Sequence, residues 1–485
     1  MRRPIALGAA SGLQPKYIAT REAELPEKNW ISRLTMHPEF REPRPICEPV
    51  APGLTSEYMK KILRAAATSL WLVLAVALLL RVGFLHQFQH EHPKQAVSVI
   101  PFLFESGNIA HSLAVGAGFS SPFRVNTGPT AWMPPVYPLL LGGIFRIFRP
   151  YTFASFIAAT LLNISFATIA CVPIFFAAKR IAGVRVAAAA AWLWAIFPNA
   201  ILIPVESMWD ASLAALLVAT ILWATLALAE SPRARDWGAY GVLWGIMLMT
   251  NATLVALFPL LLAWVAYRAY KQQRLWLGKL ALSLAVAVLC CAPWTIRNYE
   301  VFHAFVPLRS GLGLQLWLGN NENTQDIFRA ERHPIYDAGE RAKYIELGEV
   351  AYMHEKQLQA VQYMQSHRAR EAHLIWRRIV SFWSGGTPTP LKDFLNVDST
   401  WFRFVLLFNL AAALGALYGT VVLVRRRSPN WFPAAVFPVI FPWAYYLSLV
   451  LPRYRLPIDP VVLLLTAVAL EGLFLALNGP SLNRS

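Results

Sequence analysis

Long apolar runs recur along the chain from Ile62 almost to its C-terminus, and short polar segments rich in Lys and Arg separate them. A membrane-spanning helix needs roughly 20 mostly apolar residues, and many of the runs are about that long. The pattern therefore predicts an all-α polytopic membrane protein with about ten transmembrane helices. Composition agrees, because 56% of the residues are hydrophobic, 15% are charged and the mean hydropathy is +0.43, values too apolar for a soluble domain.

Residues 1–58 differ from the rest of the chain. They are polar, rich in Pro, Glu and Arg, and show no sustained hydrophobic period, so we expect them to be disordered. From Met59 the chain has the basic flank and the apolar run of a first membrane helix, and we hypothesise that translation starts there. The run lacks a small-residue cleavage site, so it is expected to remain as a helix over 59–84.

The basic residues predict the orientation of the helices. Cytoplasmic loops carry excess Lys and Arg, so the flank from Lys60 to Arg64 places the start of the first helix inside. The later basic clusters in short loops also fall on the inside if helices 2–7 lie in 153–296 and if 402–485 contains helices 8–10 and a short C-terminal tail. The formal charge of +17 thus reflects topology, and nucleic acid is not predicted as a partner.

Two large segments are left outside the membrane by this threading. The first, 85–152, contains the short apolar stretch 137–148, which we place as an interfacial helix because it is short and carries Arg146, with Arg149 directly after it. The second, 297–401, is long enough to form a small helical region. Its apolar residues, such as Leu358 and Val361, recur close to helical intervals.

Several stretches resemble a known family. They are FESGNIAHSLAVGAGFSSPF (104–123), TGPTAWMPPVYPLLLGGIF (127–145), APWTIRNYEVFHAFVPLRSGLGLQLWLGNN (292–321) and RYRLPIDP (453–460). Together they are similar to bacterial GT-C glycosyltransferases of the protein O-mannosyltransferase and aminoarabinose transferase group. The resemblance covers most of the chain from Met59 to Leu477. It implies a multi-pass enzyme of the bacterial inner membrane, surrounded by membrane lipids, with its active site facing the periplasm.

The resemblance also implies a reaction. A sugar would pass from a polyprenyl-phosphate donor to a lipid, glycan or protein acceptor, with inversion at the sugar. Polyprenyl phosphate is already a good leaving group, so one carboxylate base for the acceptor hydroxyl suffices, whereas a glycosidase needs two carboxyl groups. Fixed cations would stabilise the charge that grows on the phosphate. The sequence predicts no metal site and names neither the sugar nor the acceptor.

Two carboxylates are candidates for the base. Glu105 is the first, because the resembling enzymes carry their essential acidic residue in this loop. Many of them have an acidic pair followed by a tyrosine, whereas here Glu105 stands alone after Phe104. Glu206 is the second, since a carboxylate at the end of an apolar helix is costly unless it is paired or functional, and Asp210 follows one helical turn later. The alternatives are a solvated loop carboxylate for Glu105 and a structural ion pair for Glu206.

Arginines near the outer helix ends are the candidate phosphate ligands. Arg453, Tyr454 and Arg455 are predicted to bind the substrate, and in an extended segment the two arginines would share a face. Guanidinium groups hold phosphate oxygens through forked, charge-assisted hydrogen bonds. The alternative is that these arginines reach toward lipid headgroups.

Three further residues complete the predicted binding set. Arg297 and Asn298 lie at another outer helix end, after Pro293 and Trp294. Asn320 follows backbone punctuated by glycines, which could approach a sugar or a phosphate closely. A simple turn is the alternative for Asn320, and Arg309 is less informative.

Two rival functions stay open. A transporter or flippase of a polyprenyl-linked substrate would be expected to show inverted repeats, broken helices or charges at mid-membrane. A glycan polymerase or ligase with a diphosphate-linked donor would also require outer arginines. Because most charges lie at helix ends and most polar residues lie outside the apolar runs, the sequence favours the transferase.

Overall fold

A computed structural model describes residues 68–91, 102, 104–272, 276–324, 330–385 and 400–478. These residues form α-helices, short 3-10 helices and loops, without a β-strand among them. The all-α, polytopic membrane fold predicted from the sequence is confirmed. The predicted disorder of 1–58 and the proposed start at Met59 concern residues outside the described ranges.

Within the described part of the chain, seven helical stretches are long and apolar enough to cross a membrane. They are α2 (Leu70–Glu91), α6 with α7 (Phe153–Ile169, Cys171–Ala182), α10 (Ala211–Leu228), η2 with α12 (Ala252–Ala256, Leu257–Lys271), α13 (Leu277–Phe302), α19 (Thr400–Arg425), and η4 and η5 with α22 (Pro452–Tyr454, Leu456–Ile458, Asp459–Asn478). An eighth consists of α8 (Val184–Ile196) and α9 (Pro198–Glu206), which are bent by 42° at their junction.

Two of the ten predicted spans are shorter than the others. They correspond to α11 (Ala234–Leu248) and to the pair α20 and α21 (Trp431–Ile440, Trp443–Leu447), so the number ten stays a prediction. The stretch expected not to span forms α5 (Val136–Phe148). With 13 residues, α5 covers only about 20 Å at 1.5 Å per residue, less than the roughly 30 Å of a bilayer core.

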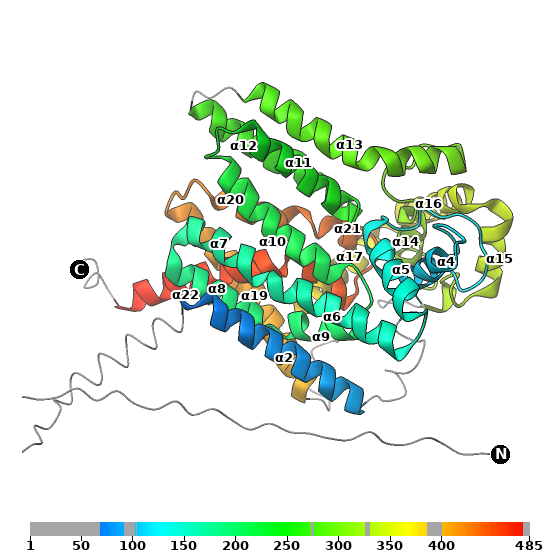
Figure 1. Ribbon diagram of the computed structural model, residues 1–485, viewed down its shortest axis with the longest axis horizontal. Coiled ribbons are helices and arrows are strands. Elements are labelled where there is room, and N and C mark those ends of the chain that lie inside the picture. Colours follow the sequence, from blue (N-terminus) through cyan, green and yellow to red (C-terminus); the bar gives the residue numbers. More distant parts are fainter. Residues whose placement is uncertain are drawn as a thin grey trace, which may run out of the picture. The chain divides into compact units, whose positions relative to one another are not determined.

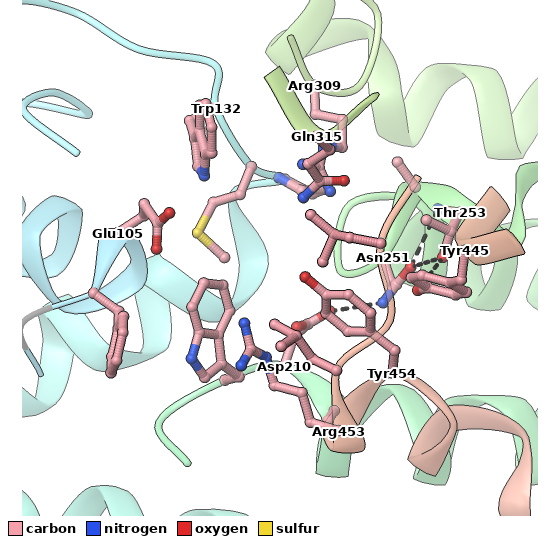
Figure 2. Close-up of a pocket in the computed structure, with 18 of the residues that line it drawn as sticks. Glu105, Trp132, Asp210, Asn251, Thr253, Arg309, Gln315, Tyr445, Arg453 and Tyr454 are labelled. Carbon is pink, nitrogen blue, oxygen red and sulfur yellow. Dashed lines mark hydrogen bonds between the residues drawn. The ribbon is translucent and has the colours of Figure 1, made fainter. Parts of the chain in front are cut away.

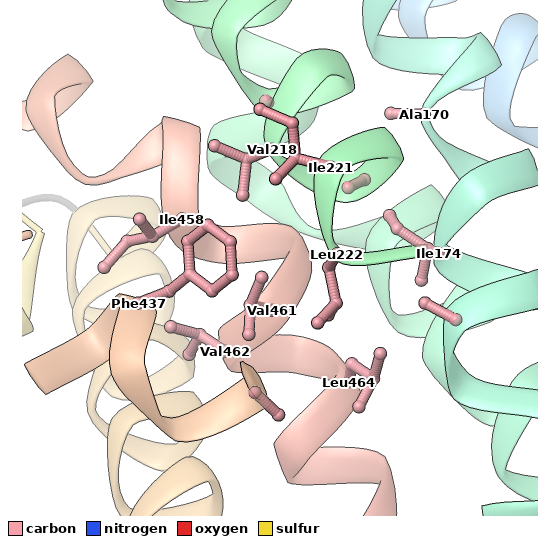
Figure 3. Packing of buried hydrophobic residues seen from close by; sticks show 14 of the residues in the cluster. Ala170, Ile174, Val218, Ile221, Leu222, Phe437, Ile458, Val461, Val462 and Leu464 are labelled. Carbon is pink, nitrogen blue, oxygen red and sulfur yellow. The ribbon is translucent and has the colours of Figure 1, made fainter. Parts of the chain in front are cut away.

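The core of the bundle is built around α22, which packs against α19, α8, α10, α20 and α7. Figure 3 shows Val461 and Val462 of α22 in contact with side chains from neighbouring helices, among them Ile221 and Phe437. Close approach comes from small residues, as is usual between membrane helices. A Cβ on Gly419 of α19 would meet the carbonyl oxygen of Leu465 at 1.9 Å, so only glycine fits there.

The bend between α8 and α9 has a local cause and a partner. Pro198 begins α9, and it lacks the N–H that would continue the hydrogen bonds of α8. Arg81, fully buried in α2, donates to the carbonyl oxygens of Trp194 at 3.2 Å, Ala195 at 3.2 Å and Ala200 at 2.9 Å. The guanidinium thus donates hydrogen bonds to carbonyl oxygens near the bend. These hydrogen bonds hold α8 and α9 against α2.

The two loop regions gather at one end of the bundle (Figure 1). The first loop region, 85–152, contributes α4 (Glu105–Ala114) and α5. The second loop region, 297–401, contributes a series of helices: α14 (Leu312–Gly319), η3 (Ala330–Arg332), α15 (Ala338–Leu347), α16 (Glu349–Ser366) and α17 (Arg368–Ser384). Its predicted helical character is therefore present, although α13 continues to Phe302, past the helix end expected near Trp294.

A buried carboxylate joins the two loop regions. Glu349, at the start of α16, accepts from the backbone N–H of Ala131 at 2.7 Å, from the hydroxyl of Ser310 at 2.6 Å, and from the hydroxyls of Thr130 and Tyr344. Such charge-assisted hydrogen bonds are stronger than neutral ones. The network fixes residues 130–131 against the second loop region and thereby shapes one wall of the cavity described next.

Candidate active site

A cavity of about 360 Å³ lies where the loop regions meet the ends of the membrane helices. The first loop region supplies Glu105 and Trp132, and the second supplies Arg309 and His333. Further walls come from the segment that links α9 to α10, from the region where α11 meets η2, and from α21, η4 and the segment between them. Figure 2 shows that Glu105, Asp210, Arg309, Arg453 and Tyr454 surround the same space.

Glu105 is the first residue of α4 and is buried, with 6% of its surface exposed. The chain turns tightly just before it: a Cβ on Gly107 would meet the carbonyl oxygen of Phe102 at 2.1 Å, so this turn requires glycine. At the N-terminus of a helix a carboxylate is also favoured by the helix dipole. Local sequence therefore places an acidic group at a buried helix start that favours its charged form.

His333, from the loop between η3 and α15, is the partner of Glu105. Its Nε2 lies 3.0 Å from Oε1 of Glu105, and both side chains are 7% exposed. The other ring nitrogen, Nδ1, accepts from the backbone N–H of Ile335 at 3.3 Å, so Nε2 is the nitrogen that donates to the carboxylate. The ring also makes edge contacts with Phe123 and Trp132, which fix its position.

The two carboxyl groups of the cavity are shifted in opposite directions. Burial alone would raise the pKa of Glu105, but His333, the backbone N–H of Glu105 and the charge of Arg453 together hold that pKa below its ordinary value. Burial raises the pKa of Asp210, and the hydrogen bond from Asn251 and the charge of Arg453 offset only part of the effect. Opposite pKa shifts give the two carboxyl groups different roles. Glu105 is favoured as the base, and Asp210 keeps its proton more readily.

Asp210 precedes the first residue of α10 and is held by a chain of polar contacts. Nδ2 of Asn251 donates to Oδ2 of Asp210 at 2.9 Å. The hydroxyl of Thr253 contacts Oδ1 of Asn251 and lies 3.1 Å from the hydroxyl of Tyr445. Figure 2 shows this chain along the wall opposite Glu105. It fixes the orientation of Asp210 and lines that wall with hydrogen-bonding groups.

Two guanidinium groups face the cavity. The Arg453 guanidinium carbon lies 4.2 Å from the ring centre of Trp209 and 5.1 Å from that of Tyr454, an arrangement that orients a cation without neutralising it. Arg309 has a buried Nε with no hydrogen-bond partner among the described residues. An orphaned buried donor of this kind costs free energy, and Arg309 is also one of the residues that line the cavity.

The structure brings three of the eight predicted site residues together. Glu105, Arg453 and Tyr454 line the cavity. Glu206 is exposed at the end of α9 and is absent from the cavity walls, so of the two candidate bases only Glu105 lies beside the arginines. The cavity contains Asp210 in place of Glu206.

Arg455 does not share a face with Arg453 as predicted. The segment is not extended but forms the 3-10 turns η4 and η5, with Pro452 as the first residue of η4 and Pro457 as the second residue of η5. Arg455 is buried inside the bundle, where its Nε donates to Asp459 at 2.6 Å and its Nη2 donates to Asn409 at 2.7 Å. Its charge holds helices together and does not reach the cavity.

Arg297, Asn298 and Asn320 also have structural partners. Arg297 donates to the carbonyl oxygens of Thr130 at 2.8 Å and Phe119 at 2.9 Å, which ties the first loop region to α13. Asn298 is buried and donates to the carbonyl oxygen of a neighbouring turn. Asn320 is buried as well and bridges α14 to the end of α21. None of the three lines the cavity.

Several polar groups of the cavity were not predicted as site residues, and four of them bear charge or contact a charged group. They are Asp210, Asn251, Arg309 and His333. Asp210 carried a signal in the sequence, since a carboxylate directly before an apolar helix is unusual. His333 lies in a polar segment far from Glu105 along the chain, and nothing in its neighbourhood points to that partner.

Comparison with known proteins supports the resemblance seen in the sequence. Residues 133–296 match the family model of dolichyl-phosphate-mannose-protein mannosyltransferases. The predicted resemblance to the GT-C group is confirmed. The matched segment includes Asp210 and Asn251 of the cavity and ends in α13. Among curated proteins, no sequence matches this chain.

Two solved structures are similar to this chain. The Archaeoglobus fulgidus oligosaccharyltransferase in complex with Zn and sulfate has 15% identity and a TM-score of 0.47, over 84% of this chain and 49% of that one. ArnT from Cupriavidus metallidurans, bound to undecaprenyl phosphate, has 14% identity and a TM-score of 0.33, over 87% of this chain and 78% of that one. The chain spans about half the length of the archaeal enzyme, and at these values neither structure assigns an activity.

Proposed function

We propose that the chain is an integral membrane glycosyltransferase that moves a sugar from a polyprenyl-phosphate donor to a lipid, glycan or protein acceptor, at the periplasmic face of a bacterial inner membrane. The observation that carries the proposal is the composition of the cavity. It places a carboxylate that favours its ionised form, Glu105, beside two guanidinium groups, Arg309 and Arg453. The reaction needs both kinds of group at one site.

Glu105 is the proposed base. As the acceptor oxygen attacks the anomeric carbon, its proton passes to the carboxylate of Glu105. The new glycosidic bond forms while the bond from the anomeric carbon to the phosphate oxygen breaks, and the electron pair of that bond leaves with the polyprenyl phosphate. Attack from the face opposite the leaving group inverts the configuration of the sugar.

The two arginines are the proposed partners of the phosphate. A sugar diester of phosphate carries one negative charge, and the released monoester carries up to two, so negative charge grows on the phosphate during transfer. Preorganised cations stabilise such growing charge without having to reorient. Arg453 is held by Trp209 and Tyr454, and Arg309 offers a donor without a partner in the described structure.

Asp210 and Asn251 are the proposed contacts of the sugar hydroxyls. A carboxyl group offers acceptor oxygens, and an amide offers both a donor and an acceptor, at fixed positions. They lie across the cavity from Glu105 (Figure 2), where a sugar bound between the two walls would reach both. This assignment leaves proton abstraction to Glu105 alone.

The transporter alternative had a broken helix and a buried membrane charge as its signatures, and the structure contains both. The bend between α8 and α9 and the buried Arg81 fit that description. However, Arg81 donates to four backbone carbonyl oxygens, including that of Ala77, so its hydrogen bonds serve the helices. The residues that line the cavity instead match the requirements of a transfer reaction.

Mass spectrometry of lipid-linked sugars and envelope glycans would test the proposal. In a strain that lacks this protein, a polyprenyl-phosphate sugar should accumulate and one envelope glycan should lose a residue, and the wild-type gene should reverse both changes. Accumulation of a diphosphate-linked donor would favour the polymerase or ligase. An unchanged set of glycans together with a lipid-linked substrate trapped on one side of the membrane would favour the flippase.

A further inference from the structure

A second cavity, of about 630 Å³, lies on the other side of α4. Its walls are the face of α4 that carries Asn108, His111 and Ser112, the loop over 117–129, and Tyr151. No residue lines both this cavity and the one that contains Glu105. The helix that carries the proposed base therefore separates two cavities, and the proposed reaction uses only the first.

The second cavity has an apolar floor with many polar side chains around it, and no carboxylate lines it among the described residues. It offers hydroxyl and amide groups together with one guanidinium, and the groups are Asn108, Ser112, Ser120, Ser121, Asn126 and Arg124. The rings of His111 and Tyr151 are stacked, with centroids 5.2 Å apart. Flat rings pack against the apolar face of a sugar, while amides and hydroxyls pair with its hydroxyl groups, so this combination suits a saccharide.

The backbone around the second cavity is strained. Ser121, Arg124 and Tyr151 have φ angles of 58°, 64° and 59°, in the left-handed region that non-glycine residues rarely adopt. They make up half of the six described non-glycine residues with positive φ. A left-handed conformation is unfavourable for such residues, and strain of this kind gathers at ligand-binding sites. The fold therefore maintains an unfavourable backbone at three residues around this cavity.

Hydrogen bonds hold the strained loop in its shape. The backbone N–H of Ser121 donates to Gly128 at 2.9 Å, and the side chain of Asn108 donates to the carbonyl oxygen of Pro122 at 2.8 Å. The Arg124 guanidinium carbon lies 5.3 Å from the ring centre of Tyr336, and Tyr336 lines the first cavity. The walls of the second cavity are thus preorganised and touch the first cavity through this contact.

We propose that the second cavity binds a neutral saccharide, the glycan part of an acceptor, while the donor occupies the first cavity. The acceptor role rests on the proposed glycosyltransferase activity, whereas saccharide binding itself does not. The absence of a carboxylate from the described lining and the presence of one exposed arginine leave hydroxyl groups as the main recognition element. A ligand held here is positioned by α4, the helix whose first residue is Glu105.

Saturation-transfer NMR on the full chain in detergent tests this site with a panel of methyl glycosides and short oligosaccharides of glucose, mannose, galactose and N-acetylglucosamine. At least one of them should give a signal. Ser112→Trp, which fills the cavity, should abolish it. Arg124→Asn, which keeps a residue tolerant of positive φ, should weaken binding by about tenfold, the contribution expected of one charged hydrogen bond.

Matched variants make the result interpretable. Arg146→Asn changes an exposed arginine on α5 that lies outside the cavity, so this variant should bind as the wild type does. Glu105→Gln should retain binding even if transfer is lost, which separates failure of this site from failure of the proposed function. Absence of binding by the whole panel, equal binding by Arg124→Asn, or competition by inorganic phosphate alone would overturn the proposal.

Discussion

Replacement of His333 by Phe gives a direct test of how Glu105 is kept ionised. The phenylalanine ring preserves the edge contacts with Phe123 and Trp132 but removes the N–H that lies 3.0 Å from the carboxylate. A hydrogen bond to a charged group contributes about 1.5–3 kcal/mol. Because each 1.36 kcal/mol is a tenfold change in an equilibrium constant, ionisation of Glu105 should become about 10- to 100-fold less favourable.

The sign of the pH effect follows from the direction of the shift. The folded protein holds the pKa of Glu105 below its ordinary value of 4.5, so the pair with His333 stabilises the fold above that pH and loses its effect as the pH falls through the folded pKa. His333→Phe should therefore raise the pKa of Glu105, lower thermal stability at neutral pH, and make stability less sensitive to acid.

Infrared difference spectroscopy can follow this titration without a known substrate. The carbonyl band of the protonated carboxyl is recorded as the pH is lowered, and Glu105→Gln identifies the part of the signal that belongs to Glu105. The band should appear at higher pH in His333→Phe than in the wild type. His333→Gln, which can still donate a hydrogen bond, should fall between them, and a Glu105 titration unchanged in His333→Phe would refute the proposed role of His333.

Three further predictions concern groups that the structure places in helix packing. Arg81→Met should lower stability by on the order of 3 kcal/mol, because buried carbonyl oxygens lose their donor, and Arg81→Lys should not restore the thermal midpoint. Asp459→Asn should lower the free energy of unfolding by about 3–5 kcal/mol, because it leaves Arg455 without its carboxylate. The double variant Arg455→Met with Asp459→Leu should recover much of that loss. If the losses of the two single variants simply add in the double variant, this interpretation is wrong. Arg297→Lys should speed amide hydrogen exchange at Thr130, because Arg297 holds that loop through its carbonyl oxygens. The affinity for the polyprenyl-phosphate sugar should not change, since Arg297 does not line the cavity.

The membrane helices were the part of the fold that the sequence predicted best, because apolar length alone decides whether a segment can span a bilayer. Inside the second loop region the pattern was less informative. Leu358 and Val361 recur at helical spacing, yet they are 56% and 38% exposed, while Tyr352 and Ala360 are buried. Packing of α14 and α15 against α16 decides which face of α16 is buried. That outcome depends on contacts between separate segments, which the spacing of apolar residues within α16 does not show.

The site shows the same division between local and tertiary information. Glu105 was predicted from its place in the first loop region, and Arg453 and Tyr454 from an unusual charged motif. Arg453 and Arg455 point to different places because the segment forms two 3-10 turns. The prediction assumed an extended segment, in which side chains alternate in direction, and so it did not anticipate these turns. His333 approaches Glu105 from more than 200 positions away, so only the folded chain reveals the pair.

The central claim is that Glu105, and not Glu206, takes the proton during sugar transfer. It is tested most directly by expressing Glu105→Gln and Glu206→Gln in the strain that lacks the protein, at matched protein levels, and measuring the lipid-linked sugar and its glycan product by mass spectrometry. Glu105→Gln should leave the donor accumulated and the product absent, while Glu206→Gln should restore the wild-type pattern. Normal product with Glu105→Gln would contradict the proposed mechanism.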